Sequence, residues 1–469
     1  MNSACPRWTR PCCTLLLLMA ALAVDAAPRP NIVLIFADDL GWKDVGYQGT
    51  DFYETPNLDR LAGEGMVFTD AYATAGNCAP SRACLLSGQY TPRHGVFAVQ
   101  STKRGPVREM RMEPVPNNQT LALANVTLAE ALRSAGYATG CFGKWHLGQE
   151  GQGTGPQQQG FDVYFDSRKA NPNRERDATT DPKGTFSNTE AACRFIAANK
   201  DRSFFAYVAH HAIHSTLEAR PETLRHFEQK PPGKQHRNVK YAGCTYDLDA
   251  GVGVLLEKLK ALGLEENTLV VFTSDNGATG QSSQEPLRGA KGGYYEGGIR
   301  EPFIVRWPAV TRPGSRCSTP VSNIDLYPTF LAAAGAEPPA GKVLDGESLL
   351  PLLQDSRGLE RKSLYWHFPG YLDKPVLRGR DRVFRTRPVS VVRRGDWKLH
   401  LYHEEWLLDG GRGRIAANNA VELYDLSADI GERHNLANEN PEKRDELLDD
   451  LLGWITQIDA PLPTARAKD

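Results

Sequence analysis

The sequence has no excess of charge of either sign. Its 55 lysine and arginine residues are balanced by 56 aspartate and glutamate residues, so the formal net charge at pH 7 is −1. A protein that binds nucleic acid normally carries a broad positive field that collects phosphates, and this composition does not supply one. We therefore expect no nucleic-acid partner, and recognition of any anion has to come from a local group of side chains.

Long apolar runs are missing after the N-terminal segment. No later stretch approaches the roughly 18 consecutive apolar residues that suggest a membrane-spanning helix. The N-terminus has Arg7 and Arg10, then an apolar run over residues 15–24 and small residues up to Ala26, which is the pattern of a signal peptide. We expect residues 1–26 to be cleaved. The mature protein is then secreted or periplasmic, or lysosomal or extracellular in a eukaryote, with no membrane span.

Cysteine and histidine residues do not cluster at the spacings that zinc sites use. Of nine cysteines, six follow the predicted signal peptide: Cys78, Cys84, Cys141, Cys193, Cys244 and Cys317. An exported protein meets an oxidising compartment, but the spacing does not say which thiols would pair. If Cys78 is reserved for chemistry, an odd number of cysteines is left, so we expect at least one free thiol.

The chain does contain a regular alternation of strand-like and helix-like segments. Strands are predicted at 31–36, 137–142, 204–209 and 268–273, and helices from Thr55-Pro56 and at 127–135, 188–198 and 240–262. Such alternation is typical of α/β layering around a mainly parallel sheet. We expect a large sheet of this kind, flanked by helices, in a catalytic domain of residues 27–359.

The pattern changes after residue 335, where a stretch with proline and glycine begins. Two strand-like runs at 389–394 and 397–402 predict a hairpin, and residues 441–458 predict an amphipathic closing helix. We therefore expect a smaller C-terminal α+β subdomain over residues 360–469.

Acidic side chains follow two of the predicted strands at once. Asp38 and Asp39 come after the first strand, and Asp275 and Asn276 come after the strand at 268–273. Ligands of open α/β sheets gather at the carboxyl ends of strands, and these oxygens suit Ca²⁺ or Mg²⁺. A single acidic pair of this kind also caps helices or makes turns. Two such pairs favour a divalent metal.

Basic side chains and histidines follow other strands. Lys144 and His146 come directly after the strand at 137–142, so a positive charge and a group that moves protons near neutral pH lie at the same edge. The strand at 204–209 is followed by His210, His211 and His214, of which one or two are expected to face a pocket. A glycine-rich loop, residues 287–302, would let Lys291 reach inward.

Cys78 begins the stretch CAPSRACLLSG. A structural cysteine needs only apolar neighbours or a partner thiol, so Pro80 and Arg82 at fixed offsets ask for a chemical explanation. Pro80 and Ser81 fit the first turn of a helix that ends at Gly88, which places residue 78 near a helix N-terminus that favours negative charge. The pieces together predict a site for a small, multiply charged oxyanion.

These residues resemble the family of sulfatases whose nucleophile is a formylglycine made from cysteine. CAPSRACLLSG is similar to the family signature of Cys, any residue, Pro, Ser, Arg, then Leu and a terminal Thr/Ser-Gly. Further blocks resemble the family in its usual order: NIVLIFADDLGW, TPNLDRLAGEGMVFTDAYA, GKWHLG, GFDVYF, TSDNG, KGGYYEGGIREPFIVRWP, IDLYPTF and ELYDLSADIGERHNLA. The resemblance covers nearly the whole mature chain. It implies an alkaline-phosphatase-like fold and hydrolysis of sulfate esters.

The resemblance also implies a maturation step and a metal. A formylglycine-generating enzyme in the export pathway would read Cys78, Pro80 and Arg82 and convert Cys78 to formylglycine (3-oxoalanine). One calcium ion would be held by the following residues: Asp38, Asp39, Cys78 in its modified form, Asp275 and Asn276. The hydrated aldehyde would attack sulfur and displace the alcohol, and its second hydroxyl would then expel sulfate. Arg82 would stabilise the modified residue and the metal site.

The remaining roles implied by the family are electrostatic and proton-transfer roles. Lys144 and Lys291 would offset charge on the sulfate oxygens. His146 is expected to take the proton of the second hydroxyl, and His214 to protonate the leaving alcohol, with His211 as the alternative.

Two other functions are compatible with parts of the pattern. A phosphodiesterase or phosphonate monoester hydrolase of the same superfamily would use similar groups, although the extra ligands of a two-zinc site are not found. An inactive exported binding protein would show damage at the site residues, and none is damaged. We expect a sulfated carbohydrate or another sulfate ester as substrate. Four aromatic residues are candidates to stack on a sugar, although aromatic residues in such numbers are also ordinary core and loop residues: Trp145, Tyr294, Tyr295 and Trp366.

Overall fold

The computed structural model describes residues 1, 2, 4, 29–170 and 179–466 of the chain. The predicted signal peptide lies outside the described residues apart from positions 1, 2 and 4. Within the described ranges, no helix is both long and apolar enough to cross a bilayer. The six cysteines after residue 29 are all free, so the expected free thiol is confirmed.

A large sheet lies at the centre of the fold, with the strand order β10-β2-β9-β8-β1-β7-β5-β6. Its strands are β1 (Asn31–Ala37), β2 (Met66–Phe68), β5 (Ala138–Gly143), β6 (Val163–Phe165), β7 (Phe204–Ala209), β8 (Thr268–Ser274), β9 (Ile304–Arg306) and β10 (Ser315–Cys317). The run from β8 to β6 is parallel throughout, and β9 is antiparallel to β8 and to β2. The expectation of a mainly parallel sheet is confirmed.

The central strand β1 shows why the sheet needs helices on both faces. Successive side chains of a strand point to opposite faces, and every residue of β1 is buried. Ile32 and Leu34 pack in one apolar cluster, whereas Val33 and Ile35 pack in another. The continuous apolar run of β1 is therefore explained by burial on both sides.

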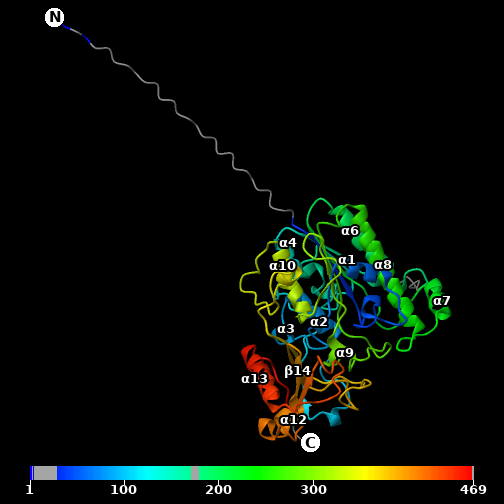
Figure 1. Cartoon of the computed structure of the whole chain (residues 1–469), viewed down its shortest axis with the longest axis vertical. Helices are drawn as coiled ribbons and strands as arrows, with labels where there is room; N and C mark the ends of the chain where they lie inside the picture. Colours follow the sequence, from blue (N-terminus) through cyan, green and yellow to red (C-terminus); the bar gives the residue numbers. More distant parts are fainter. Residues whose placement is uncertain (3, 5–28, 171–178, 467–469) are drawn as a thin grey trace.

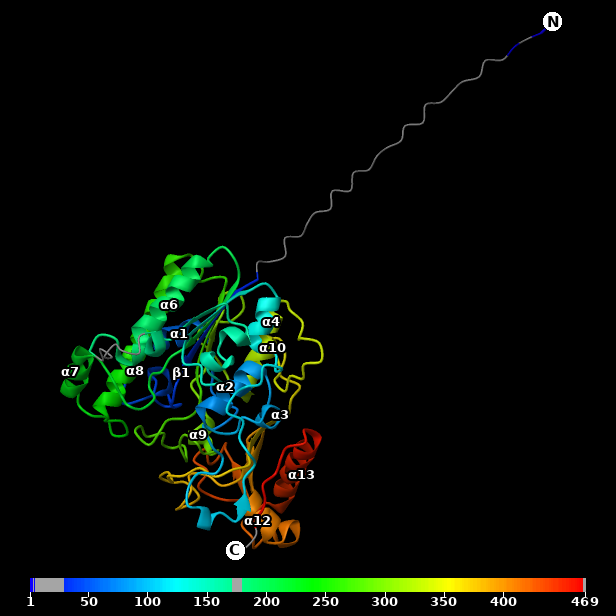
Figure 2. The same ribbon diagram turned by 180° about the vertical axis from the view of Figure 1, so that it is seen from behind.

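The helices form two layers around the sheet (Figures 1 and 2). One layer consists of α1 (Pro56–Glu64), α6 (Thr185–Ala198), α7 (Pro221–Gln229) and α8 (Val239–Ala261), and the other of α2 (Cys78–Ser87), α4 (Leu128–Ser134) and α10 (Leu326–Ala333). As predicted, α2 ends at Gly88, whose φ of 66° is left-handed and suits glycine. α4 begins with a capping box in which Thr127 and Glu130 satisfy each other's backbone N–H groups.

The C-terminal region forms a second, antiparallel sheet in the order β12-β13-β14-β15. Its strands are β12 (Ser363–Phe368), β13 (Val389–Arg394), β14 (Trp397–Tyr402) and β15 (Val421–Asp425), and the closing helix is α13 (Pro441–Gln457). α13 packs its apolar side on one face of this sheet. The other face shares a core with earlier segments, because Tyr72 and Phe97 pack with Trp366 and Val391. The boundary near residue 360 stays a prediction, and β12 begins just after it.

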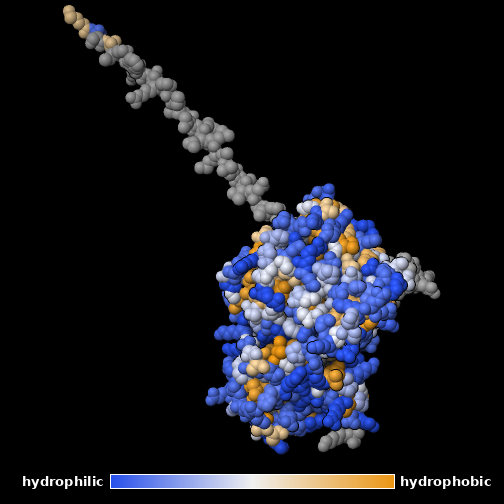
Figure 3. Space-filling model, turned by 45° about the vertical axis from the view of Figure 1, so that its right-hand side comes forward, coloured by the Kyte–Doolittle hydropathy of each residue, from blue (hydrophilic) through white to orange (hydrophobic). Residues whose placement is uncertain are grey.

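Short elements complete the described chain. The pairs β3 (Ala71–Tyr72) with β11 (Val321–Ser322) and β4 (Met112–Glu113) with β16 (Thr464–Ala465) form small ladders, and the short helices are α3 (Thr91–His94), α5 (Ser167–Ala170), α9 (Glu296–Ile299), α11 (Leu350–Leu353) and α12 (His403–Leu408). The face in Figure 3 is mainly hydrophilic, and its hydrophobic atoms occur in small scattered groups.

Candidate active site

The predicted site residues meet at the carboxyl ends of the parallel strands. Asp38 follows β1, Asp275 follows β8 and Lys144 follows β5, so three strands deliver their side chains to one edge of the sheet. A cavity of about 850 Å³ opens at this edge. Its lining includes the following predicted residues: Asp38, Cys78, Lys144, His146, His211, His214 and Lys291. The topology therefore gathers groups that lie far apart in the sequence.

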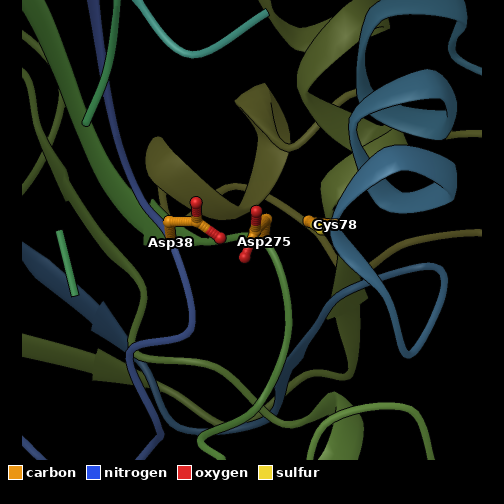
Figure 4. Close-up of side chains that lie close together, drawn as sticks. All are labelled: Asp38, Cys78 and Asp275. Carbon is orange, nitrogen blue, oxygen red and sulfur yellow. The ribbon is translucent and has the colours of Figure 1, made fainter. Parts of the chain in front are cut away.

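Cys78 is the first residue of α2 and points at the acidic strand ends. One oxygen each of Asp38 and Asp275 and the Sγ of Cys78 lie within 4.8 Å of one another. In Figure 4, Asp275 lies between Asp38 and Cys78, which projects from the start of α2. A cation held by the two carboxylates would therefore also lie within reach of the side chain of residue 78.

Asp39 and Asn276 extend this group of oxygens. Asp39 has a left-handed backbone with φ of 68°, which aspartate tolerates better than most residues. Its N–H donates to Asp275 Oδ1 at 3.1 Å, and Asn276 Nδ2 donates to Asp39 Oδ1 at 2.8 Å. Asp38 Oδ1 and Asn276 Oδ1 are buried without any hydrogen-bond partner. Orphaned buried oxygens beside three carboxylates fit an oxygen-ligated divalent cation such as calcium.

Three basic side chains balance the three carboxylates. Arg82 is fully buried and binds Asp275 Oδ2 through Nε at 3.0 Å and Nη2 at 2.7 Å. Lys144 Nζ lies 2.5 Å from Asp38 Oδ2, and Lys291 Nζ lies 2.5 Å from Asp39 Oδ1. Both lysines also face the cavity, whereas Arg82 does not. The lysines can thus contact an anionic ligand, while Arg82 orients Asp275.

Burial and charge act against each other on these groups. Burial alone would raise the pKa of Asp38, but Lys144 and Arg82 outweigh it and hold the pKa well below its usual value. Burial and the Asp38 carboxylate raise the pKa of Asp275 to about 6 in spite of Arg82. Burial would lower the pKa of Lys144, but Asp38 raises it, so this ammonium group stays charged. A divalent cation between the two aspartates would favour the ionised form of both.

The histidines of the site differ in their surroundings. His146 has a φ of 66°, and its Nδ1 is buried without a partner. Burial, followed by the charge of Lys144, lowers its pKa to about 3, so its imidazole is neutral near pH 7. His214 Nε2 lies 4.0 Å from Asp39 Oδ2, and its side chain is 39% exposed. Burial lowers its pKa as well. His214 is therefore the more accessible of the two from the cavity.

His211 has a partner that the sequence analysis missed. Its Nε2 lies 2.9 Å from Asp166 Oδ1, and both residues line the cavity. Asp166 comes directly after β6, which is the same position after a strand that singled out Asp38. Applying that rule to the short strand at GFDVYF would have found it. His210, by contrast, is buried and does not line the cavity.

The expectation for the aromatic residues is wrong in three of four cases. Trp145 lines the cavity, but Tyr294, Tyr295 and Trp366 do not. Tyr294 stacks on Phe368, Trp366 Nε1 donates to the Ala73 carbonyl, and the Tyr295 hydroxyl donates to a glutamate of β15. These three rings belong to the junction with the C-terminal sheet, because burying them there removes large apolar surfaces from water.

A cavity that combines three carboxylates, two lysines and a residue at a helix N-terminus is suited to bind a small oxyanion. The family profile described as Sulfatase matches residues 30–336, and the profile described as N-sulphoglucosamine sulphohydrolase, C-terminal, matches residues 290–458. The chain belongs to the sulfatase family, whose members hydrolyse sulfuric esters.

Individual relatives agree with this assignment. A sulfatase of Formosa agariphila is 33% identical over 93% of this chain and 90% of its own. Human arylsulfatase A is 34% identical over 90% of this chain and 86% of its own. The crystal structure of Ps i-CgsB in complex with k-i-k-neocarrahexaose has a TM-score of 0.71 at 29% identity, covering 91% of this chain and 92% of that chain.

Proposed function

We propose that this protein hydrolyses sulfate esters of carbohydrates, with a formylglycine derived from Cys78 as nucleophile and one bound calcium ion. The observation that carries the proposal is the position of Cys78, the first residue of α2. Its Sγ and one oxygen each of Asp38 and Asp275 lie within 4.8 Å of one another, and Lys144 and Lys291 line the same cavity. A nucleophile at this place faces a bound oxyanion between two ammonium groups.

The maturation step has to precede folding. Cys78 is 2% exposed and Arg82 is 0% exposed, and both lie inside the first two turns of α2. A formylglycine-generating enzyme could read Cys78, Pro80 and Arg82 only on the unfolded chain. After folding, Arg82 binds Asp275. The same arginine thus serves recognition first and positioning afterwards.

The calcium ion would be held by these residues: Asp38, Asp39, Asp275, Asn276 and residue 78 in its modified form. When bound, it would supply Lewis-acid polarisation of a sulfate oxygen. Lys144 and Lys291 would bind the other sulfate oxygens, because their ammonium groups line the cavity and offset negative charge that develops during displacement.

Proton transfer falls to the histidines. His146 is neutral near pH 7 and has an unpartnered Nδ1, so it can accept the proton of a hydroxyl on residue 78. His214 donates its Nδ1–H to the Ser215 carbonyl at 2.7 Å, which leaves Nε2 for the cavity. The negative charge of a bound sulfate ester raises the His214 pKa and makes its acid form available to the leaving oxygen.

The carbohydrate assignment is supported by the comparisons. The C-terminal profile is that of an N-sulphoglucosamine sulphohydrolase, and the structure of Ps i-CgsB is a complex with k-i-k-neocarrahexaose. We also propose export through the N-terminal signal peptide, a catalytic domain of residues 27–359 and a C-terminal subdomain of residues 360–469.

The proposal is tested by two measurements on the purified protein co-expressed with a formylglycine-generating enzyme. Mass spectrometry of the peptide containing residue 78 should show formylglycine, and p-nitrophenyl sulfate should release p-nitrophenol. Cys78→Ser should abolish turnover. Cys317→Ser, at the half-buried cysteine that ends β10 away from the cavity lining, is the matched control and should keep it.

Three outcomes would count against the proposal. Full turnover with unconverted Cys78 would refute the nucleophile. Faster hydrolysis of p-nitrophenyl phosphate than of the sulfate would favour the phosphoesterase or phosphonate hydrolase alternative. Complete conversion with no hydrolysis of either ester, nor of sulfated monosaccharides, would favour the binding-protein alternative.

A further inference from the structure

Three arginines line the reaction cavity without a role in the chemistry described so far: Arg104, Arg168 and Arg385. Two of them, Arg104 and Arg385, lie close enough for the charge of Arg104 to act on Arg385. The Arg104 N–H donates to the Tyr371 carbonyl at 3.2 Å, and the Arg385 N–H donates to the Leu372 carbonyl at 2.7 Å. The two arginine backbones thus lie on either side of residues 371–372 in a small ladder of bridges.

The charges of Arg104 and Arg385 are only partly balanced by protein groups. Arg104 Nη2 lies 2.6 Å from Asp373 Oδ1. Arg385 donates Nε to the Lys374 carbonyl and Nη1 to the Lys291 carbonyl, each at 3.2 Å. Among residues 29–170 and 179–466, no carboxylate forms an ion pair with Arg385. Burial and the like charge of Arg104 lower the Arg385 pKa. One carboxylate therefore serves two guanidinium groups.

Arg385 lies directly against the loop that carries Lys291. A Cβ built on Gly292 would lie 2.4 Å from Arg385 Cδ, so the absence of a side chain at Gly292, whose φ is 87°, lets the arginine lie on the loop. With its Nη1 bonded to the Lys291 carbonyl, Arg385 adjoins the lysine that we assign to the scissile sulfate. An anion bound at Arg385 would thus belong to the same substrate molecule.

We propose that Arg385, assisted by Arg104, binds a second anionic group of the substrate, a sulfate or a carboxylate next to the sugar whose sulfate is cleaved. The planar guanidinium fork matches both anions. The inference rests on the proposed function and narrows its substrate to saccharides with at least two negative charges. Its site combines a loop between β12 and β13 with residues near position 104, and so joins the C-terminal sheet to the cavity.

The test compares three oligosaccharides that share one scissile sulfate. One has no other charge, one has an added sulfate, and one has a uronate carboxylate. Arg385→Gln should lower kcat/KM for the two-anion substrates about 10- to 100-fold more than for the singly charged one, mainly through KM. Arg385→Lys should restore part of the loss. Arg382→Gln removes an exposed arginine of the same loop that forms no ion pair with any of the described residues, and it should match the wild type on all three substrates.

A second measurement needs no turnover. Calorimetry gives the affinity of the same oligosaccharides for the Cys78→Ser protein, with and without Arg385→Gln. A selective effect of Arg385→Gln on the disulfated or the uronate compound supports the site and identifies its anion. Equal losses on all three substrates would mean that Arg385 only supports the Lys291 loop and would overturn the inference, as would no loss at all. Absence of sulfate ester hydrolysis together with selective binding would refute the proposed function but keep this site.

Discussion

A buried ion network ties the Lys291 loop to the C-terminal sheet, and its removal gives the most quantitative prediction. Lys398 Nζ on β14 lies 2.9 Å from Glu296 Oε1 and 3.0 Å from Glu432 Oε1, and all three side chains are 0% exposed. Glu296 begins α9, five residues after Lys291. Lys398→Met removes this charge, so that Glu296 retains Arg300 Nη1 at 2.7 Å and Glu432 retains the His400 imidazole at 3.1 Å.

Removing one partner of a buried ion pair costs about 3–5 kcal/mol, because the remaining charge is not solvated. Here that charge is Glu432, which is left beside a His400 imidazole that burial keeps neutral, whereas Glu296 keeps its ion pair with Arg300. Burial, opposed by Lys398, raises the pKa of Glu432 to about 7, above the value of about 4.3 of an unfolded glutamate. Between these two pKa values the folded protein holds a proton on Glu432 that the unfolded chain has lost, so the free energy of unfolding falls as the pH rises. Without Lys398 its pKa rises further. The deficit of the variant should be largest above pH 7 and should shrink towards pH 5, where Glu432 takes up a proton.

The assay is urea unfolding followed by tryptophan fluorescence at pH 5 and pH 8, with kcat/KM on p-nitrophenyl sulfate measured in parallel. The double variant Lys398→Met with Glu432→Gln should regain part of the lost stability at pH 8. Lys362→Met, which removes an exposed lysine, is the control and should unfold like the wild type. A deficit below about 1 kcal/mol at both pH values, or one equal at both, would refute the reasoning.

Three further predictions concern the site itself. His214→Ala should slow the hydrolysis of sugar sulfates about 10²- to 10⁴-fold and that of p-nitrophenyl sulfate far less, because p-nitrophenolate leaves without a proton. The variant should also lose the alkaline decline of kcat on sugar sulfates. Equal losses on both substrates would contradict the role of His214 as the acid. Lys291→Ala should cost about 10²- to 10³-fold in kcat on either substrate, and a loss confined to KM would show that the lysine binds only the ground state. Chelation of the metal should lower both the activity and the thermal midpoint of unfolding, and added calcium should restore both. Asp275→Asn should weaken calcium binding measured by calorimetry. Unchanged activity after exhaustive chelation would exclude the metal.

Local sequence pattern was enough to predict most of the catalytic edge. The apolar runs of β1 and β8 are strands buried on both faces, and residues directly after such strands fall on one edge of a parallel sheet. That rule is enough to predict that Asp38 and Asp275 lie together. Likewise, Pro80 in the first turn of α2 and Gly88 at its end follow helix-end preferences that depend only on neighbours in the chain.

Contacts between distant segments were decided by the tertiary structure alone. Arg385 reaches the cavity because residues 371–372 pair with two separate segments, and nothing in its own neighbourhood of the sequence indicates that. Trp366 and Tyr294 have aromatic rings that could stack on a sugar, but both are buried at the junction of the two sheets. The sequence by itself determined which groups follow each strand and where α2 begins, because backbone preferences and strand periodicity act over a few residues. Which charges around the cavity remain without a partner was determined only by the packing of the C-terminal sheet against the large sheet. The reason is that the charge around the cavity comes from side chains that lie hundreds of positions apart in the sequence.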